Sequence, residues 1–229
     1  MKKALMILAV VAVVATGCNK ETQAPQNGTE NGHEWVDLGL PSGTLWATCN
    51  IGAATPEAYG DYFAWGETTA KEIYNWSNYK YANGAENKLT KYCNSSVYGD
   101  NGFTDGLTTL LLEDDAATAN WGGAWRMPTA DEMRELRDNC SHTSATQNGV
   151  EGHLYTAKNG NSLFLPAAGL RYDAGSQDVG SDGYYWSSSI DTNNAGRVWR
   201  LSFGPESYSM ITRYRCYGYT MRPVCPAQH

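Results

Sequence analysis

Helical periodicity and metal-binding spacings are both scarce in this 229-residue chain. One segment near the middle carries a clear helical pattern, so strands and loops are expected to make up most of the fold. No Cys-x-x-Cys or Cys/His spacing typical of zinc occurs, and the histidines are scattered. No spacing suggests a Ser/His/Asp or Cys/His catalytic arrangement. The sequence therefore predicts no metal site and no catalytic residues.

Long apolar runs are absent beyond the N-terminus. Lys2 and Lys3 precede an apolar run over 4–17, which is too short to cross a bilayer as a helix and predicts a signal peptide over residues 1–17. The run leads through small residues to Cys18, a pattern that resembles the bacterial lipobox. This resemblance implies that Cys18 is lipidated and becomes the mature N-terminus, whereas the alternative is an ordinary signal sequence with an incidental cysteine.

Residues 19–34 contain almost no large apolar side chain and cannot offset the entropy cost of ordering. We therefore expect a lipidated N-terminus and flexible tether over 18–34, followed by one domain over 35–229. Asn19 stands where the lipoprotein sorting rule places Asp for inner-membrane retention. The expected location is the outer membrane, lipid-anchored, with its surface-exposed and periplasmic sides both open.

Basic residues are in the minority, with 17 Lys and Arg against 24 Asp and Glu. Removing Lys2 and Lys3 with the signal peptide leaves 15 against 24, a net charge of −9. Phosphate binding needs a basic face, so nucleic acid is excluded as a partner. The expected partners are the membrane, through the N-terminal lipid, and a glycan or protein ligand.

Beyond Cys18 the chain has five cysteines, and an exported protein is expected to bridge them. Two bridges among five cysteines can be arranged in 15 ways, so spacing leaves the pairing open. The preferred pairing joins Cys93 with Cys140 and Cys49 with Cys225, which leaves Cys216 unpaired.

Short strands are predicted from apolar stretches bounded by Gly, Pro, Asp or Asn. A hairpin is expected over 34–52, around Pro41-Ser42-Gly43. Further strands are expected over 162–167, 184–188, 197–203 and 219–224. The polar segment 68–115 has no sustained period and predicts long ordered loops, with a helical turn near 107–112.

The single helical segment has a strong start signal. Thr129 and Glu132, three residues apart, form a capping box, so the helix is expected to begin at Ala130 and to end at Asn139 or Cys140. Its apolar side chains repeat at helical spacing and predict one buried face. This face consists of Met133, Leu136 and Cys140.

Seven motifs along the chain occur in one order: DLGLPSGTLWATCNIGA, GDYFAWGE, LTKYC, EDDAATANWGGAWRMPTADEMREL, NSLFLPAAGLR, GYYWSSS and MRPV. Together, over about residues 34–226, they resemble the Fibrobacter succinogenes major paralogous domain family of Bacteroidetes lipoproteins. That family is similar to the C-type-lectin-like fold, which includes the formylglycine-generating enzymes. The resemblance implies an α+β fold of small twisted antiparallel sheets with one or two helices and long loops. It also implies structural roles for Arg126, Thr129 and Glu132.

The enzymes on this fold use a close cysteine pair near the C-terminus, whereas Cys216 and Cys225 lie nine residues apart. We therefore expect no enzymatic activity, with oxidoreductase-like chemistry at these cysteines as the alternative. The E-P-N, Q-P-D and W-N-D motifs of calcium-dependent lectins are absent, and no cofactor is expected. The acidic loop 173–182 offers the oxygen ligands that a structural Ca²⁺ prefers, but a solvated turn explains it equally well.

The segment 183–224 differs from the rest of the chain. It contains 6 Tyr, 6 Ser, 5 Arg and 2 Trp, no Lys, and a net charge of +3. This composition resembles a binding surface, because Tyr and Trp give contact area at low entropy cost and Arg gives planar donor forks. The alternative is that its aromatic residues form core. The candidate ligand-binding residues are Ser189, Asp191, Asn193, Asn194, Arg197, Trp199, Arg200, Ser207, Tyr208, Tyr214 and Tyr217.

C-type-lectin-like lipoproteins include targets of diversity-generating retroelements, whose C-terminal variable regions favour Asn, Tyr, Ser, Asp, Thr and Arg. The segment 183–224 fits this residue set. The sequence thus predicts an outer-membrane lipoprotein that binds a ligand through its C-terminal strands and loops, as a diversified receptor or adhesin. A structural subunit of a cell-surface assembly is the alternative.

Overall fold

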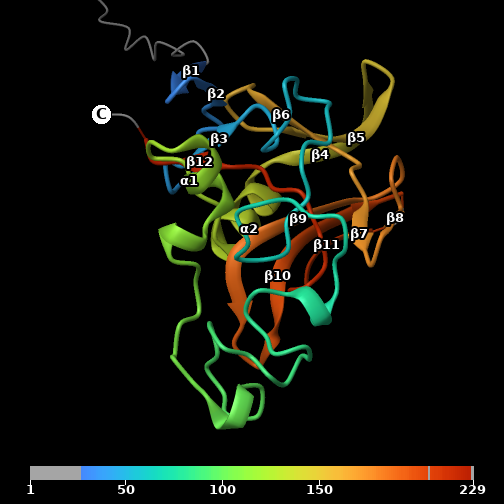
Figure 1. The fold of residues 1–229 in the computed structure, drawn as a ribbon. Helices are drawn as coiled ribbons and strands as arrows, with labels where there is room; N and C mark the ends of the chain where they lie inside the picture. The colour runs from blue at the N-terminus through green and yellow to red at the C-terminus, as the bar shows by residue number, and fades with distance from the viewer. Residues whose placement is uncertain (1–26, 206, 228–229) are drawn as a thin grey trace, which may run out of the picture.

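Four small antiparallel sheets and two α-helices form the part of the chain that the computed structural model describes, residues 27–205 and 207–227 (Figure 1). The α+β class is therefore confirmed. The expected signal peptide and the lipidated Cys18 lie outside the described residues. Within those residues, no helix has the length and apolar character needed to cross a membrane.

Each sheet is built from short strands. The first contains β1 (Asn27–Glu30), β2 (His33–Val36), β3 (Leu45–Ala47) and β12 (Val224–Cys225). The second contains β4 (Ser141–Gln147), β5 (Val150–Thr156) and β6 (Ser162–Pro166). The third, called the central sheet below, contains β9 (Gly183–Asp191), β10 (Asn194–Gly204) and β11 (Ser207–Tyr214). The fourth pairs β7 (Leu170–Tyr172) with β8 (Gly175–Gln177).

The hairpin β1–β2 corrects the predicted tether boundary. Strand β1 pairs in register with β2 across a turn at Asn31 and Gly32, both of which have positive φ. Asn-Gly is the dipeptide that such tight hairpin turns prefer. The Trp125 indole N–H donates to the Glu30 carbonyl oxygen at 2.8 Å. Residues 27–34 are therefore part of the fold, because backbone pairing and this contact replace the apolar side chains that they lack.

Helix α2 (Ala130–Asn139) begins and ends as predicted. The Thr129 side chain accepts from the Glu132 N–H at 3.2 Å, and the Glu132 carboxylate accepts from the Thr129 N–H at 2.8 Å. Glu132 also forms an ion pair with Arg126 at 2.5 Å. A further hydrogen bond, from the Thr44 hydroxyl at 2.9 Å, ties the same carboxylate to the N-terminal sheet. This one glutamate therefore caps the helix and joins three segments, which confirms the structural role expected of it.

The central sheet is buried on both faces. Along β9, Trp186 belongs to the core cluster packed against the long loops, whereas Tyr185 belongs to the cluster around α2 and β4–β6. Successive side chains of a strand point to opposite faces, which explains why the aromatic residues of GYYWSSS follow one another without polar residues between them. On β10, Val198 faces the first cluster and Leu201 the second. The pairing of β9 with β10 shifts register near Val198, which explains why the apolar residues of β10 do not alternate simply.

Some of the other sequence predictions are confirmed and others are wrong. The expected pairing within 34–52 is confirmed, since β2 pairs with β3, and the strands expected over 162–167, 184–188 and 197–203 are confirmed as β6, β9 and β10. Of 219–224, only Val224 belongs to a strand. The helical turn predicted near 107–112 is wrong: this stretch bridges to β9 at Ser189, and a 3₁₀ turn follows at η3 (Leu112–Asp114). The hairpin β4–β5 was not predicted.

Long loops over 48–115 cover one side of the central sheet, and two buried arginines hold them (Figure 1). Arg215 is fully buried and donates to the carbonyl oxygens of Tyr92 at 3.0 Å and Lys91 at 2.7 Å. Arg222 is also fully buried and donates to the Thr48 carbonyl oxygen at 2.6 Å and the Asn50 side-chain oxygen at 2.8 Å. Irregular backbone buried in this way must find hydrogen-bond partners, and these guanidinium groups provide them.

Replacing Arg222 with Met removes these donors and leaves carbonyl oxygens buried without partners. We expect the free energy of unfolding to fall by about 3 kcal/mol. Arg137→Met is the control, because Arg137 pairs with the exposed Asp138, and its effect should stay within about 0.5 kcal/mol. Urea unfolding followed by Trp fluorescence measures both. Equal effects of the two substitutions would contradict the assigned role.

The Glu132 network predicts acid sensitivity. Burial alone raises the pKa of Glu132, but hydrogen bonds from Arg126 and Thr129 outweigh it and hold the pKa at about 2. Because the folded pKa is below the unfolded value, this stability is present above about pH 4.5 and is lost as the pH falls toward 2. We expect Glu132→Gln to unfold more easily at neutral pH and to lose less stability between pH 5 and pH 2 than the wild type. Equal slopes in pH-dependent urea unfolding would refute this.

Candidate functional site

The eleven candidate ligand-binding residues are spread along the central sheet and do not form one surface. Three of them, Asn194, Arg197 and Tyr214, lie at the β9–β10 turn end of the sheet, where the long loops meet it. Arg197 pairs in register with Tyr214 across β10 and β11. These three residues line a surface hollow of about 440 Å³. The opposite wall comes from the long loops and consists of Glu86, Asn87, Val97 and Tyr98.

This hairpin hollow, defined by those seven residues, combines charge, aromatic surface and hydrogen-bonding groups. The Arg197 guanidinium lies 4.8 Å from the centre of the Tyr214 ring, and its Nη2 donates to the Tyr214 hydroxyl at 3.4 Å. The Asn194 amide donates to the Glu86 carboxylate at 3.4 Å. Val97 is 73% exposed at the rim. The hollow thus presents a cation, an anion, two tyrosines and an apolar rim within one small volume.

The backbone brings the two walls together at Gly196. A Cβ at this position would lie 2.5 Å from Cγ of Glu86, so the glycine leaves room for the Glu86 side chain to pack against β10. The Asn94 amide donates to the carbonyl oxygen of Thr192 at 2.8 Å, which ties the loop to the β9–β10 turn. Both contacts join segments about a hundred residues apart in the sequence.

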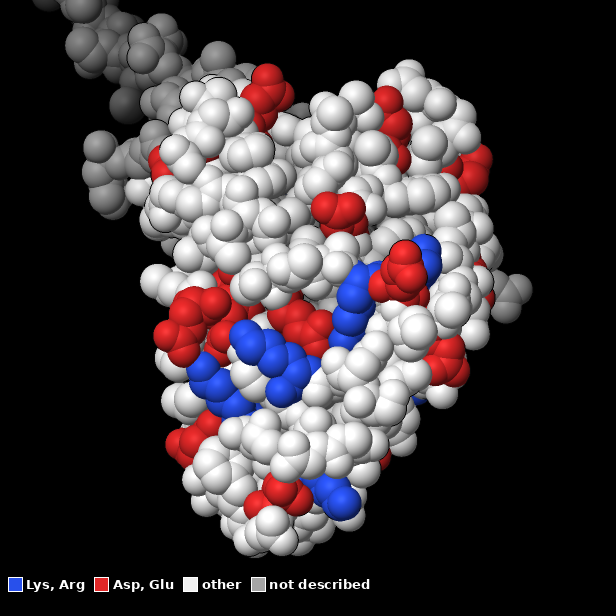
Figure 2. All heavy atoms as spheres, in the orientation of Figure 1, with Lys and Arg blue, Asp and Glu red and all other residues white. Residues whose placement is uncertain are grey.

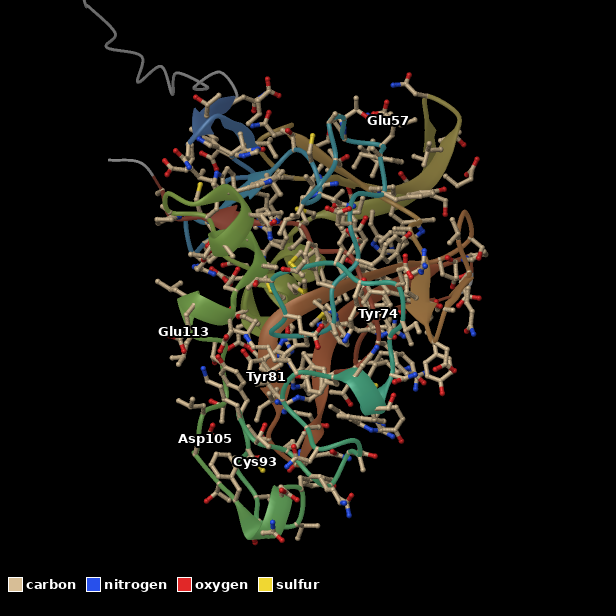
Figure 3. All side chains as sticks on the ribbon, viewed as in Figure 1. Glu57, Tyr74, Tyr81, Cys93, Asp105 and Glu113 are labelled. Carbon is tan, nitrogen blue, oxygen red and sulfur yellow. The ribbon has the colours of Figure 1, made fainter. Side chains whose placement is uncertain are left out.

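The loop wall is ordered by a turn around the half-buried Asp105. Its carboxylate accepts from the backbone N–H groups of Tyr92 at 2.7 Å and Cys93 at 2.8 Å. Figure 3 shows Cys93 and Asp105 together in the lower part of the molecule, where the long loops gather. One carboxylate therefore takes the place of a secondary-structure partner for this stretch of irregular backbone.

The remaining candidates lie elsewhere. The Ser189 hydroxyl accepts from the first N–H of α2 at 3.2 Å, and Asp191 accepts from the Asn193 N–H at 3.0 Å within the turn, so the contacts of Ser189 and Asp191 are structural. The Trp199 ring is covered by Arg134, whose Cζ lies 4.6 Å from the ring centre.

Three candidates occupy other parts of the surface, and one is not on the surface. Ser207 and Tyr208 lie at the far end of β11, in a hollow shared with His142. Tyr217 packs against Tyr172 with ring centres 4.8 Å apart. Arg200 is only 3% exposed, so its prediction as a surface contact is wrong. Arg200 is buried because its side chain points from β10 toward a covered face of the central sheet.

The sequence analysis did not predict the residues of the loop wall. Glu86, Asn87, Val97 and Tyr98 fall within 68–115, where no periodicity indicates which side chains face a ligand. The available signal was the length of an ordered, polar segment, since such loops often carry function.

A second polar cluster crosses the middle of the face in Figure 2, where basic and acidic side chains gather in a depression. Among such charged groups, Asp114 is buried and accepts from Lys91 at 2.6 Å, from the Tyr92 hydroxyl at 2.6 Å and from the Tyr81 hydroxyl. Burial raises its pKa, but these hydrogen bonds outweigh it and hold the pKa at about 2. Because its donors already saturate this carboxylate, the cluster joins loop to loop and leaves no oxygen for a substrate.

The disulfide predictions are wrong, because the structure joins none of the five cysteines among the described residues. Cys93 and Cys140 belong to different core clusters, on opposite faces of the central sheet. Cys225 pairs in register with Leu45, four residues before Cys49 along the chain.

Thiol chemistry has little support at the C-terminal cysteines. Cys216 and Cys225 are fully buried, and burial raises their thiol pKa values to about 12 and about 11. Both therefore stay protonated at neutral pH, and the thiol is a poor nucleophile.

The acidic loop 173–182 has protein partners for its carboxylates. Asp178 accepts from the Tyr184 hydroxyl at 2.9 Å, and Asp173 accepts from the Asn75 amide at 2.7 Å. Nowhere in residues 27–205 and 207–227 do three or more His, Cys, Asp or Glu side chains form a group that could hold a metal ion.

Comparison with family models, with curated proteins and with solved structures gave no match for this chain.

Burial predicts the order of thiol reactivity. In the soluble chain 19–229 at pH 8, we expect Cys49, which is half-buried and lines a surface hollow, to react with Ellman's reagent in the native state. The four buried cysteines should react only after denaturation.

Two variants serve as the controls for this titration. Cys49→Ser should remove the native signal, and Cys216→Ser should retain it. Fewer than five thiols after denaturation without reductant would show disulfide bonds and contradict the structure.

Proposed function

We propose that this chain is an outer-membrane lipoprotein whose single C-type-lectin-like domain binds a glycan or protein ligand at the hairpin hollow. The observation that supports this most directly is the meeting of two independent segments there. The segment with the composition of a binding surface supplies Asn194, Arg197 and Tyr214, and the long ordered loops supply the facing wall. A volume of about 440 Å³ is typical of a site for a small ligand group.

The chemistry of the hollow suits a ligand with both polar and apolar surfaces. Tyr214 and Tyr98 offer ring surface at low entropy cost, and Arg197 and Asn194 offer donors. A sugar residue has this combination of hydroxyl groups and an apolar face, and so does a polar side chain at a protein interface. The burial of Cys216 and Cys225 counts against the enzymatic alternative.

The fold assignment rests on the resemblance of the motifs together with the architecture. Small antiparallel sheets, one well-capped helix and long loops are the features that the resemblance implies. The membrane anchor rests on the motif around Cys18, which is separated from β1 by eight intervening residues. A chain of that length cannot place β1 more than roughly 30 Å from a lipid attached at Cys18.

A binding array tests the proposal. The soluble chain 19–229 is applied to mixed glycans and host surface proteins beside the double variant Asn194→Ala, Arg197→Ala. We expect the variant to unfold cooperatively and to lose affinity about tenfold or more, because charged hydrogen bonds to the ligand disappear.

The matched control is Ser207→Ala with Tyr208→Ala, at the other end of the same strands. It should bind as the wild type does. Binding lost only in this control would move the site to the far end of the central sheet. Binding by neither the wild type nor any variant would overturn the ligand-binding function.

A further inference from the structure

Arg200 is a buried cation without an anionic partner. Its side chain is 3% exposed, and its Nε and Nη1 have no hydrogen-bond partner among the described residues. The guanidinium Cζ lies 3.9 Å from the centre of the Tyr184 ring and 4.8 Å from that of Tyr219. Ring faces stabilise a cation, but they do not replace hydrogen bonds to its N–H groups.

The other two buried arginines show how this chain otherwise treats a buried guanidinium. Arg215 and Arg222 are each fully buried, and each donates hydrogen bonds to carbonyl, hydroxyl or amide oxygens from all three of its nitrogens. Leaving a buried donor unpaired costs free energy, and leaving a buried charge unpaired costs more. Arg200 is thus the exception within one domain, and its unpaired donors need an explanation.

A second arginine lies beside it on the same face of the central sheet. Arg200 pairs in register with Ile211, so Arg213 is its diagonal neighbour on β11, at a separation of roughly 7–8 Å between Cα atoms. Arg213 is exposed. Burial lowers the pKa of Arg200, and the charge of Arg213 lowers it further. The two positive charges therefore lie close together and repel each other.

The rest of this face supplies hydroxyl groups. Ser202 pairs in register with Ser209, as Arg200 does with Ile211. Because Ser202 is two positions from Arg200 and Ser209 is two positions from Ile211, both serines lie on the same face as Arg200. Asp178 accepts from the hydroxyl of Tyr184, whose ring covers Arg200, at 2.9 Å. The cluster keeps its positive charge in a chain whose total is −7.

We propose that Arg200 and Arg213, with the hydroxyls of Ser202 and Ser209, form a binding site for an oxyanion carried by a ligand, either a carboxylate or a sulfate or phosphate ester. Arg213 makes the outer contact, and Arg200 provides the positive floor. Guanidinium forks match both types of oxyanion, so the shared chemistry is an anionic group with two or three acceptor oxygens.

This site is separate from the hairpin hollow. None of its four residues, Arg200, Ser202, Ser209 and Arg213, lines that hollow. A ligand at one site does not occupy the other. The oxyanion site can therefore be tested whatever the fate of the proposed function.

Side-chain NMR of the chain 19–229 provides the test. Sodium acetate and sodium sulfate are titrated at constant ionic strength against sodium chloride, and the Nε–H signal of Arg200 is followed. This signal is assigned by its absence in Arg200→Lys. We expect a saturable shift with at least one of the two oxyanions and none with chloride. A stronger response to acetate identifies a carboxylate ligand, and a stronger response to sulfate identifies a sulfate or phosphate ester.

Exposed variants keep the test independent of folding. Arg213→Gln should weaken oxyanion binding about tenfold. Arg134→Gln, which removes a half-buried arginine stacked on Trp199, should leave it unchanged. The proposal is overturned if acetate, sulfate and chloride all give the same linear shift, or if Arg213→Gln binds as tightly as the wild type.

Discussion

Irregular backbone that is buried must still satisfy its N–H and C=O groups, and this requirement governs most of the structure. Charged side chains meet it in both directions. Arg215 and Arg222 donate to loop carbonyl oxygens. Asp115 and Asp105 accept from backbone N–H groups, with Asp115 joining the start of α1 (Ala116–Trp121) to the backbone of Met127 at 2.8 Å. A domain with few helices thereby keeps long loops in a single arrangement.

The central sheet turns this arrangement into a layered core. Its two faces belong to two clusters, one under the loops and one against α2 and β4–β6. Because both faces are covered, the surface left for ligands is confined to the ends of the sheet, its β11 edge and the loops that meet them. The hairpin hollow lies at one such end, where Gly196 allows the loop wall to approach.

The sequence predicted the parts whose signals are local. The capping box of Thr129 and Glu132 lies within four residues, and α2 begins where it indicates. The hairpin β4–β5 was missed because SHTSATQ, the sequence of β4, has no apolar alternation. The hairpin is stabilised instead by the pairing of β4 with β5 and of β5 with β6. Arg200 was predicted as a surface contact because composition does not say which face of a strand is covered. The walls of the hairpin hollow join positions about a hundred residues apart, and no pattern in the sequence records that approach.

The separation of the hollow from the core has a consequence for how this domain can change over generations. Tyr98 and Tyr214 pack against the first core cluster, but Asn194, Arg197 and the other loop residues of the hollow belong to neither cluster. Strand β10 holds its place through backbone pairing on both sides. Substitutions at the positions outside the clusters change the lining of the hollow while the packing of the two clusters stays intact. The lining of the hollow and the packing of the core therefore depend largely on different residues, which is the property that makes a scaffold evolvable.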